Sequence, residues 1–379
     1  MSDPISLYVV AGEESGDARG AELLSALKRR LPQVQISGAG GPRIQALASG
    51  RFLEWTSEAV VGLWDVLKKY DYFRQQFDRM LDELEASRPE ALLLIDYPGF
   101  NLRLAKAARE RFPEIKIIYY ISPQVWAWNR GRIGKMAGFL DLMLCIFPFE
   151  KALYEASGLK TEFVGHPMLD TLASLKTGSA RKENLVGLFP GSRTREVRRL
   201  FPVMMEAARL LSSQVPNLQF EVAASNPSVA AWMFDYLNEH RFDPSFCRIG
   251  MDRFYGLTQE AAVGMVCSGT ATLEAAYFGL PMAILYKVAW LTWTVGKQLV
   301  KVPHIGMPNV LAGKEIAKEF LQGAAKPKAI ADELKRLLLD QNARSLQQAE
   351  FAKIITQLGS PGAGERAAEV VADALKSQK

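Results

Sequence analysis

The sequence has few of the side chains that bind metals or form disulfides. Its 379 residues include three cysteines and three histidines. The cysteines, Cys145, Cys247 and Cys267, stand far apart and form no CxxC pair. We therefore expect no metal site and no disulfide framework, and we expect a reducing compartment such as the cytosol.

The sequence also lacks a long uninterrupted apolar run. The best candidate, residues 279–300, opens with a Gly-Leu-Pro turn and is interrupted by Lys287. We predict a buried strand over Met282–Tyr286 followed by a helix. The N-terminal residues lack the charged region and apolar core of a signal peptide, so we expect none. A soluble or peripheral protein is the expectation.

Charge of either sign is modest. The net charge is +5 and the pI is about 8.9. These values suit an anionic ligand or an anionic membrane surface, and they fall short of a nucleic-acid-binding signature. The surplus of basic residues lies after residue 170. An anionic ligand is therefore predicted in the second half of the chain.

Short apolar runs alternate with helix-length amphipathic segments along the chain. We predict strands at residues 5–11, 34–39, 91–96, 115–121, 141–146, 161–165, 185–189, 219–223, 263–267 and 282–286. This alternation predicts an α/β fold with doubly wound parallel sheets flanked by helices.

A polar stretch at residues 170–184 interrupts the alternation. We predict a first domain over residues 1–170 and a second over 171–344. Polar helices over 345–379 are expected to pack back across both domains. Two such domains bind ligands in the cleft between them, at the carboxyl ends of their strands.

The segment VVAGEESGDARGAELL, residues 9–24, reads as strand, glycine-containing loop and helix. Many nucleotide sites begin in this way. However, Glu13, Glu14 and Asp17 place negative charge where a pyrophosphate would lie. We predict that this loop does not hold a nucleotide, and that Ser15 caps the helix.

Asp96 stands at the end of a predicted buried strand in LLLIDYPGFN. Asn101 lies directly before the apolar face of the next helix and is expected to cap it. Asp96 is then available as a general base at the mouth of the cleft, which we favour over a turn or capping role.

Two strand–turn–helix segments in the second half have the features of an anion site. Ser192 and Arg193, in PGSR, open a predicted helix whose backbone N–H groups can bind an anion, and Arg195 adds a charged donor. Ser268, Gly269 and Thr270 repeat this arrangement, and Glu274 follows one turn into the next helix, placed to bind ribose hydroxyls. The structural alternatives are an exposed basic helix start and an ordinary acid near a helix N-terminus.

Two further segments are ambiguous from their residues alone. Asn309 and Gln322 have the character of surface or capping amides. In residues 60–81, Trp64, Lys68 and Tyr72 fall on one side of a predicted helix. This row is typical of an interfacial membrane contact, and core aromatics explain it equally well.

Nine motifs together resemble the lipid-A-disaccharide synthase family, in the family's order and across nearly the whole chain. They are AGEESGD (11–17), GAGGPR (38–43), IDYPGFN (95–101), SPQVWAW (122–128), IFPFEK (146–151), GHPM (165–168), PGSR (190–193), SGTATLE (268–274) and PNVLAG (308–313). SPQVWAW and PNVLAG are specific to the family, whereas PGSR and SGTATLE also suit other sugar-nucleotide enzymes. Glu14 is a departure, because the family usually has Thr there.

The resemblance implies an inverting glycosyltransferase of the GT-B fold that needs no metal or cofactor. Its donor would be UDP-2,3-diacylglucosamine and its acceptor 2,3-diacylglucosamine 1-phosphate. The products would be the β-1,6-linked disaccharide 1-phosphate and UDP, formed on the cytosolic face of the Gram-negative inner membrane.

The resemblance also implies roles for individual residues. Asp96 would remove the proton of the acceptor's 6-hydroxyl. The donor side would comprise Ser192, Arg193, Ser268, Gly269, Thr270, Glu274, Asn309 and Gln322. Ser15 and Asp17 would lie on the acceptor side, and Trp64, Lys68 and Tyr72 would contact the anionic membrane surface.

Two other functions fit the same sequence architecture. One is a UDP-N-acetylglucosamine 2-epimerase, against which SPQVWAW argues. The other is a non-catalytic, membrane-associated protein that binds a sugar nucleotide. The sequence does not distinguish a monomer from a homodimer, and we expect no nucleic-acid partner.

Overall fold

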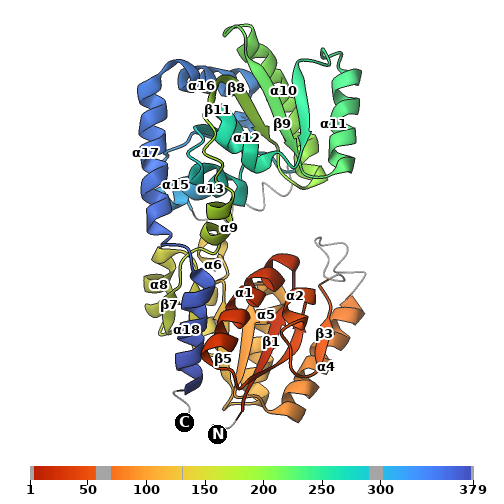
Figure 1. Cartoon of the computed structure of the whole chain (residues 1–379), viewed down its shortest axis with the longest axis vertical. Helices are drawn as coiled ribbons and strands as arrows, with labels where there is room; N and C mark the ends of the chain where they lie inside the picture. The colour runs from red at the N-terminus through yellow and green to blue at the C-terminus, as the bar shows by residue number, and fades with distance from the viewer. Residues whose placement is uncertain (1–3, 57–69, 130, 290–301, 377–379) are drawn as a thin grey trace. The chain divides into compact units, whose positions relative to one another are not determined.

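The computed structural model describes residues 4–56, 70–129, 131–289 and 302–376 (Figure 1). The chain divides into two compact units. The first combines Met1–Asp170 with Leu358–Lys379, and the second is Thr171–Gln357. The second unit thus runs beyond the predicted end at residue 344, and the segment 345–379 is shared between the units.

The two C-terminal helices differ in what they pack against. In α17 (Gln341–Gln357), the buried Gln347 side chain accepts a hydrogen bond from the backbone N–H of Met282 (2.7 Å), which ties this helix to the second unit. In contrast, α18 (Ala363–Lys376) buries a face of small apolar side chains against α1 (Glu14–Arg30). The helices of residues 345–379, predicted to pack back across the domains, thus comprise one helix on each unit.

The first unit contains a parallel sheet of seven strands within the described residues, in the order β3-β2-β1-β4-β5-β6-β7. The strands are β1 (Ile5–Ala11), β2 (Val34–Gly40), β3 (Phe52–Glu54), β4 (Ala91–Ile95), β5 (Lys116–Tyr120), β6 (Leu142–Cys145) and β7 (Thr161–Phe163). The central β4, with sequence ALLLI, is buried along its whole length. Such continuous apolar strands form because helices cover both faces of a parallel sheet.

Helices connect the strands of the first unit. Besides α1 and α18 they are α2 (Pro42–Gln45), α4 (Tyr70–Ser87), α5 (Pro98–Arg111), α6 (Val125–Trp128), α7 (Gly131–Ala137), α8 (Pro148–Glu155) and α9 (Met168–Ser174), which crosses into the second unit. Glu13 occupies the N-cap position of α1. The prediction that Ser15 caps this helix was therefore wrong, and Ser15 lies exposed in its first turn.

The second unit contains a parallel sheet of six strands within the described residues, in the order β10-β9-β8-β11-β12-β13. They are β8 (Lys182–Phe189), β9 (Gln219–Ala224), β10 (Cys247–Met251), β11 (Ala261–Cys267), β12 (Met282–Tyr286) and β13 (Glu319–Leu321). Its helices are α10 (Thr194–Ser212), α11 (Pro227–Glu239), α12 (Phe254–Glu260), α13 (Thr270–Tyr277), α15 (Met307–Ala312), α16 (Pro327–Leu339) and α17, with a 3-10 turn at Gln322–Ala324.

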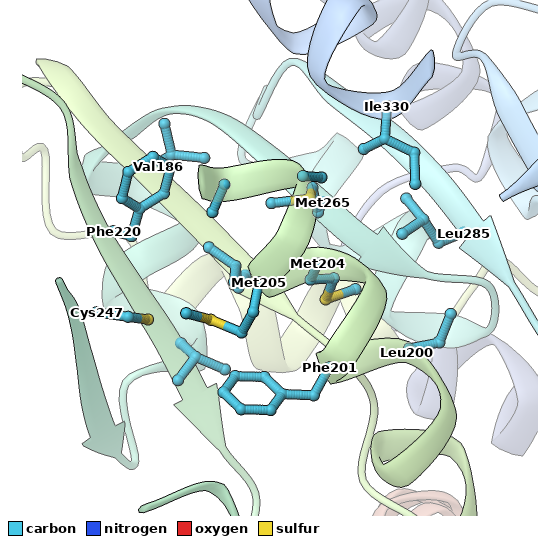
Figure 2. Packing of buried hydrophobic residues seen from close by; sticks show 14 of the residues in the cluster. Val186, Leu200, Phe201, Met204, Met205, Phe220, Cys247, Met265, Leu285 and Ile330 are labelled. Atoms are coloured by element: carbon cyan, nitrogen blue, oxygen red, sulfur yellow. The ribbon is translucent and has the colours of Figure 1, made fainter. Parts of the chain in front are cut away.

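The amphipathic helix α10 anchors the core of the second unit. Figure 2 shows Phe201, Met204 and Met205 of this helix among side chains of the sheet, including Phe220 and Met265. These side chains are almost completely buried. The turn that precedes α10 is thereby fixed relative to the sheet.

All ten predicted strands form, and the predicted α/β class is confirmed. The helix predicted after β12 falls on residues 290–301, outside the described part of the chain. Three strands were missed, namely β3, β10 and β13. Each is an edge strand, and it therefore needs less apolar sequence than a central strand covered on both faces.

Both sheets reverse their strand order once, between β1 and β4 in the first unit and between β8 and β11 in the second. In open α/β sheets, ligands bind beyond the carboxyl ends of the strands at such a reversal. AGEESGD and IDYPGFN follow β1 and β4, and PGSR and SGTATLE follow β8 and β11. Among the described residues, no helix has the length and hydropathy needed to cross a bilayer.

Candidate active site

The chain at Asp96 adopts an unusual backbone conformation directly after β4. Asp96 has φ +47° and Tyr97 has φ +50°, so two consecutive non-glycine residues are left-handed. This conformation costs about 1–2 kcal/mol per residue and persists only where surrounding contacts enforce it. Here the Asp96 carbonyl oxygen accepts hydrogen bonds from the Tyr119 hydroxyl (2.6 Å) and the Asn101 amide (2.8 Å).

Asn101 has a different role from the predicted one. The N-cap position of α5 is Tyr97, so the prediction that Asn101 caps this helix was wrong. Asn101 is fully buried, and its Nδ2 donates to the carbonyl oxygens of Asp96 and Ile95 (3.2 Å). It thus holds the end of β4 to the start of α5 and fixes the backbone that carries the Asp96 carboxylate.

The Asp96 carboxyl has a raised pKa. Burial disfavours its charged form and is the main cause; a hydrogen bond from the Tyr97 backbone opposes the shift, and the negative charge of Glu13 adds to it. Together they raise the pKa of Asp96 to about 6. The group is therefore mostly ionised at neutral pH and close to the pKa at which a general base works well.

The AGEESGD loop lies against the Asp96 loop. A methyl group built on Gly12 would come within 2.1 Å of the Tyr97 ring, so only glycine fits there. Asp17 is buried, and its carboxylate accepts hydrogen bonds from the N–H groups of Gly41 (2.9 Å), Arg43 (3.0 Å) and Ile44 (3.0 Å). The predicted acceptor contact of Asp17 is corrected, because these bonds commit its carboxylate to the start of α2.

An aromatic cluster supports the same loop. Trp55 is fully buried, its Nε1 donates to the carbonyl oxygen of Ala11 (2.7 Å), and its ring meets those of Tyr97 and Phe100 edge to face. In α4, Phe73 extends the cluster and contacts the ring of the partly buried Tyr72. Trp64 and Lys68, predicted to accompany Tyr72 in a membrane contact, lie outside the described residues.

The motifs SPQVWAW and IFPFEK are joined through a buried carboxylate. Glu150 accepts hydrogen bonds from the Ser122 hydroxyl (2.5 Å) and the Trp126 indole (2.8 Å). Burial raises the pKa of Glu150 to about 7, and these hydrogen bonds limit the rise. SPQVWAW follows β5, the neighbour of β4, and Glu150 therefore shapes the loop next to that of Asp96.

The second unit has a pocket of about 470 Å³ at its strand reversal. The structure brings six of the predicted donor residues to its wall: Ser192, Arg193, Ser268, Gly269, Thr270 and Glu274. Arg195 is not among the lining residues. The pocket is of the size of small-ligand sites.

Two helix N-termini line this pocket. Neither α10 nor α13 has a side-chain cap at its start, so their first backbone N–H groups are open to an anion. The lining charges are Arg193, Glu196 and Glu274, and Arg193 pairs with Glu196 at 3.3 Å. What the pocket offers to an anion is therefore mainly the two helix ends, and not a surplus of cationic side chains.

Sequence reasoning missed the aromatic wall of the pocket. Phe189, Phe254 and Tyr255 line it, and the rings of Phe189 and Phe254 meet edge to face with centroids 5.3 Å apart. The Tyr255 hydroxyl lies 3.3 Å from the Glu274 carboxylate. The only sequence signal is the Phe-Tyr pair at the start of α12, a short helix that was not predicted.

Two predicted donor residues do not line this pocket. Asn309 is fully buried, and its amide bonds to the backbone of Ile316 and Ala317 and to the Glu319 carboxylate (2.8 Å). Gln322 lies in a separate depression together with Lys287. Asn309 therefore holds the start of α15 to β13. The donor-site role predicted for Asn309 and Gln322 stays a prediction.

Ser268 lines the pocket and also forms hydrogen bonds within the protein. Its hydroxyl donates to the carbonyl oxygen of Ile305 (3.2 Å). The backbone N–H of Ser268 donates to the carbonyl oxygen of Leu285 (2.8 Å). Both Ser268 donors are thus committed to the protein, and the N–H groups of Gly269 and Thr270 are the ones that the turn offers to an anion.

Comparisons with known proteins agree with these motifs. A family model described as lipid-A-disaccharide synthetase matches residues 7–373. The chain belongs to this family. Lipid-A-disaccharide synthase of Syntrophus aciditrophicus is 39% identical over 381 residues, covering 98% of both chains. The same enzyme of Trichlorobacter lovleyi is 39% identical over 384 residues, covering 97% of both.

Solved structures with much lower identity share the fold of this family member. The S. aureus MnaA–UDP co-structure has a TM-score of 0.62 at 11% identity, covering 99% of this chain and 96% of the other. The calicheamicin glycosyltransferase CalG4 has a TM-score of 0.58 at 13% identity, covering 100% and 99%. The predicted GT-B type architecture of two Rossmann-like domains is thereby confirmed.

Proposed function

We propose that this chain transfers 2,3-diacylglucosamine from UDP-2,3-diacylglucosamine to the 6-hydroxyl of 2,3-diacylglucosamine 1-phosphate. The products are the β-1,6-linked disaccharide 1-phosphate and UDP. Membership in the lipid-A-disaccharide synthetase family over residues 7–373 carries this proposal. The two sites at the strand reversals supply the chemistry.

Asp96 is the proposed general base. Its carboxylate takes the proton of the acceptor's 6-hydroxyl while the oxygen attacks C1 of the donor sugar. The bond between C1 and the diphosphate oxygen breaks, UDP leaves, and the configuration at C1 inverts. A pKa of about 6 keeps the carboxylate ionised at neutral pH and basic enough to accept the proton.

The pocket of the second unit is the proposed UDP site. The N–H groups at the starts of α10 and α13, together with Arg193, stabilise the charge that develops on the departing diphosphate. Glu274 accepts hydrogen bonds from the ribose hydroxyls. The rings of Phe254 and Tyr255 offer a flat apolar surface for the uracil base. No metal or cofactor has a role in this scheme.

Arg193 can be tested with a neighbouring arginine as its control. We expect Arg193→Ala to weaken UDP binding about tenfold, because a charge-assisted hydrogen bond is lost and Glu196 loses its partner next to the diphosphate. Arg195→Ala removes the same charge from an exposed residue that does not line the pocket, and it should change the affinity less than about twofold. Calorimetric titration with UDP measures both, and equal effects would refute the assignment.

We further propose that the protein acts peripherally at the anionic cytosolic face of the Gram-negative inner membrane, since both substrates carry acyl chains. The segment containing Trp64, Lys68 and Tyr72 is the proposed contact. A Trp64→Ser, Lys68→Glu variant should co-sediment less with vesicles that contain anionic phospholipid. Unchanged partitioning of that variant would refute this contact.

The activity itself is tested by incubating the enzyme with both diacylglucosamine substrates and detecting disaccharide and UDP by mass spectrometry. No product above the enzyme-free control would refute the proposed function. Inversion at C2 of UDP-N-acetylglucosamine, followed by NMR, would instead indicate an epimerase. UDP binding without turnover of any acceptor would indicate a non-catalytic binding protein.

A further inference from the structure

A second pocket, of about 200 Å³, lies on the first unit between α5 and α7. Its rim includes Pro98, two residues after Asp96 in the chain. Four cationic side chains line it: Arg103 and Lys106 from α5, and Arg132 and Lys135 from α7. None of its lining residues is acidic.

Two of these four cations have no ion-pair partner among the described residues, and a third has an exposed one. Lys106 has a partner in Glu110 at 3.6 Å, but both side chains are 67% exposed, so this ion pair is weak. Arg103 and Lys135 form no ion pair within the described part of the chain. The charges of Arg103 and Lys135 are therefore available for charge-assisted hydrogen bonds to an anion that enters the pocket.

Part of the pocket lining is apolar. Leu102 and Met136, which are buried, and Phe139 also line the pocket. A lining of cations and apolar side chains favours a phosphate that is attached to a less polar body over free inorganic phosphate. The volume holds a phosphate and part of a sugar, and is too small for a whole diacylated sugar.

The UDP pocket uses different chemistry. It offers two helix ends and two carboxylates, whereas the pocket on the first unit offers four cations and no carboxylate. The α5–α7 pocket also shares α5 with the Asp96 loop. Arg103 stands five residues beyond Pro98, or about 8 Å along the helix, which is on the scale of one sugar ring.

We propose that the α5–α7 pocket binds the phosphate monoester of the acylated acceptor sugar. Held there, the acceptor directs its sugar toward the start of α5, where Asp96 meets the 6-hydroxyl. This assignment rests on the proposed function, and it adds an acceptor-phosphate site to the base already described.

The test is an Arg103→Ala, Lys135→Ala double variant assayed in neutral-detergent micelles. We expect the acceptor KM to rise about tenfold from the loss of two charge-assisted contacts at exposed positions, with the donor KM unchanged. The matched control, Arg51→Ala with Lys160→Ala, removes one arginine and one lysine from exposed positions of the same unit outside the pocket. It should leave both KM values within about twofold of the wild type.

A dephosphorylated acceptor, 2,3-diacylglucosamine, separates a phosphate contact from a general effect. Wild type and double variant should use it with the same KM, because the group recognised by Arg103 and Lys135 is absent. An unequal KM, or an unchanged KM for the phosphorylated acceptor, would overturn the proposal. A loss of binding to anionic phospholipid vesicles with an unchanged acceptor KM would overturn it in favour of a bilayer contact.

A binding measurement separates this proposal from the proposed function. Calorimetry with the phosphorylated acceptor in micelles, without donor, needs no turnover. A wild type that makes no disaccharide refutes the proposed function, while weaker acceptor binding by the double variant still supports the phosphate site. Equal binding by wild type and double variant overturns the site, whatever the activity.

Discussion

Replacing Asp96 with asparagine should stabilise the protein and inactivate it. In the native state the pKa of Asp96 is about 6, compared with an ordinary value of 3.8. Because the native state holds this proton more tightly than the unfolded state does, ionisation of Asp96 destabilises the fold as pH rises from 4 through 6. From the difference between these two pKa values, ionisation of Asp96 lowers the free energy of unfolding by about 3 kcal/mol above pH 7 and by about half of that at pH 5.

An asparagine side chain cannot ionise and has nearly the same shape as aspartate, so Asp96→Asn removes this cost. The free energy of unfolding of the variant should therefore exceed that of the wild type by about 1.4 kcal/mol more at pH 7.5 than at pH 5. Hydrogen exchange of the buried amides of β4 reports the local opening free energy next to Asp96 at both pH values. The change between the two pH values also cancels contributions of the substitution that do not depend on pH.

The same variant should lose at least about 100-fold in disaccharide formation, the usual contribution of a positioned general base. The reasoning fails if the stability difference between wild type and variant is the same at pH 5 and pH 7.5. It also fails if the variant keeps a kcat near that of the wild type. The first result would refute the raised pKa of the buried Asp96 carboxyl, and the second would refute its role as general base.

Two further substitutions test the environment of the base. Glu13→Gln removes the negative charge that helps raise the pKa of Asp96, so the acid limb of the pH profile of kcat/KM, near pH 6 in the wild type, should move to lower pH; an unmoved or upward-moving limb would contradict this. Gly12→Ala should destabilise the first unit by about 1–3 kcal/mol through overpacking and lower kcat, because the new methyl group overlaps the Tyr97 ring. Its control, Gly134→Ala, has no heavy atom within 4 Å of the added methyl group and should retain stability and activity, as measured by thermal unfolding and the disaccharide assay.

The sequence was sufficient to predict the sheets and the location of Asp96. Buried parallel strands are continuously apolar, and a polar residue at the end of one stands where ligands bind. The edge strands β3, β10 and β13 lack that signal. The second compact unit extends to Gln357, beyond the predicted residue 344, because Gln347 bonds to the Met282 backbone, 65 residues earlier in the chain.

The roles of single polar residues were harder to predict. A carboxylate that binds a ligand and one that caps a distant loop follow the same local pattern. Asp17 accepts hydrogen bonds from backbone groups 24 to 27 residues away, and Asn309 bonds to the backbone just before β13. The sequence next to Asp17 or Asn309 gives no sign of these partners. The α5–α7 pocket did have a signal, since Arg103/Lys106 and Arg132/Lys135 are two i, i+3 cation pairs. The overall charge balance of the first 170 residues concealed it.

The three hydrogen bonds of Asp17 have a consequence for the interpretation of mutational data. An alanine scan scored by product formation alone would rank Asp17 and Asp96 together. Loss of the Asp17 carboxylate leaves three backbone N–H groups, two of them buried, without their acceptor, and this loosens the loop beside the base. Protein abundance or melting temperature, recorded in the same scan, would separate them: Asp17 variants should be scarce or unstable, and Asp96 variants abundant and inactive. A variant that is inactive but stable therefore identifies a catalytic carboxylate, whereas a variant that is inactive and unstable identifies a structural one.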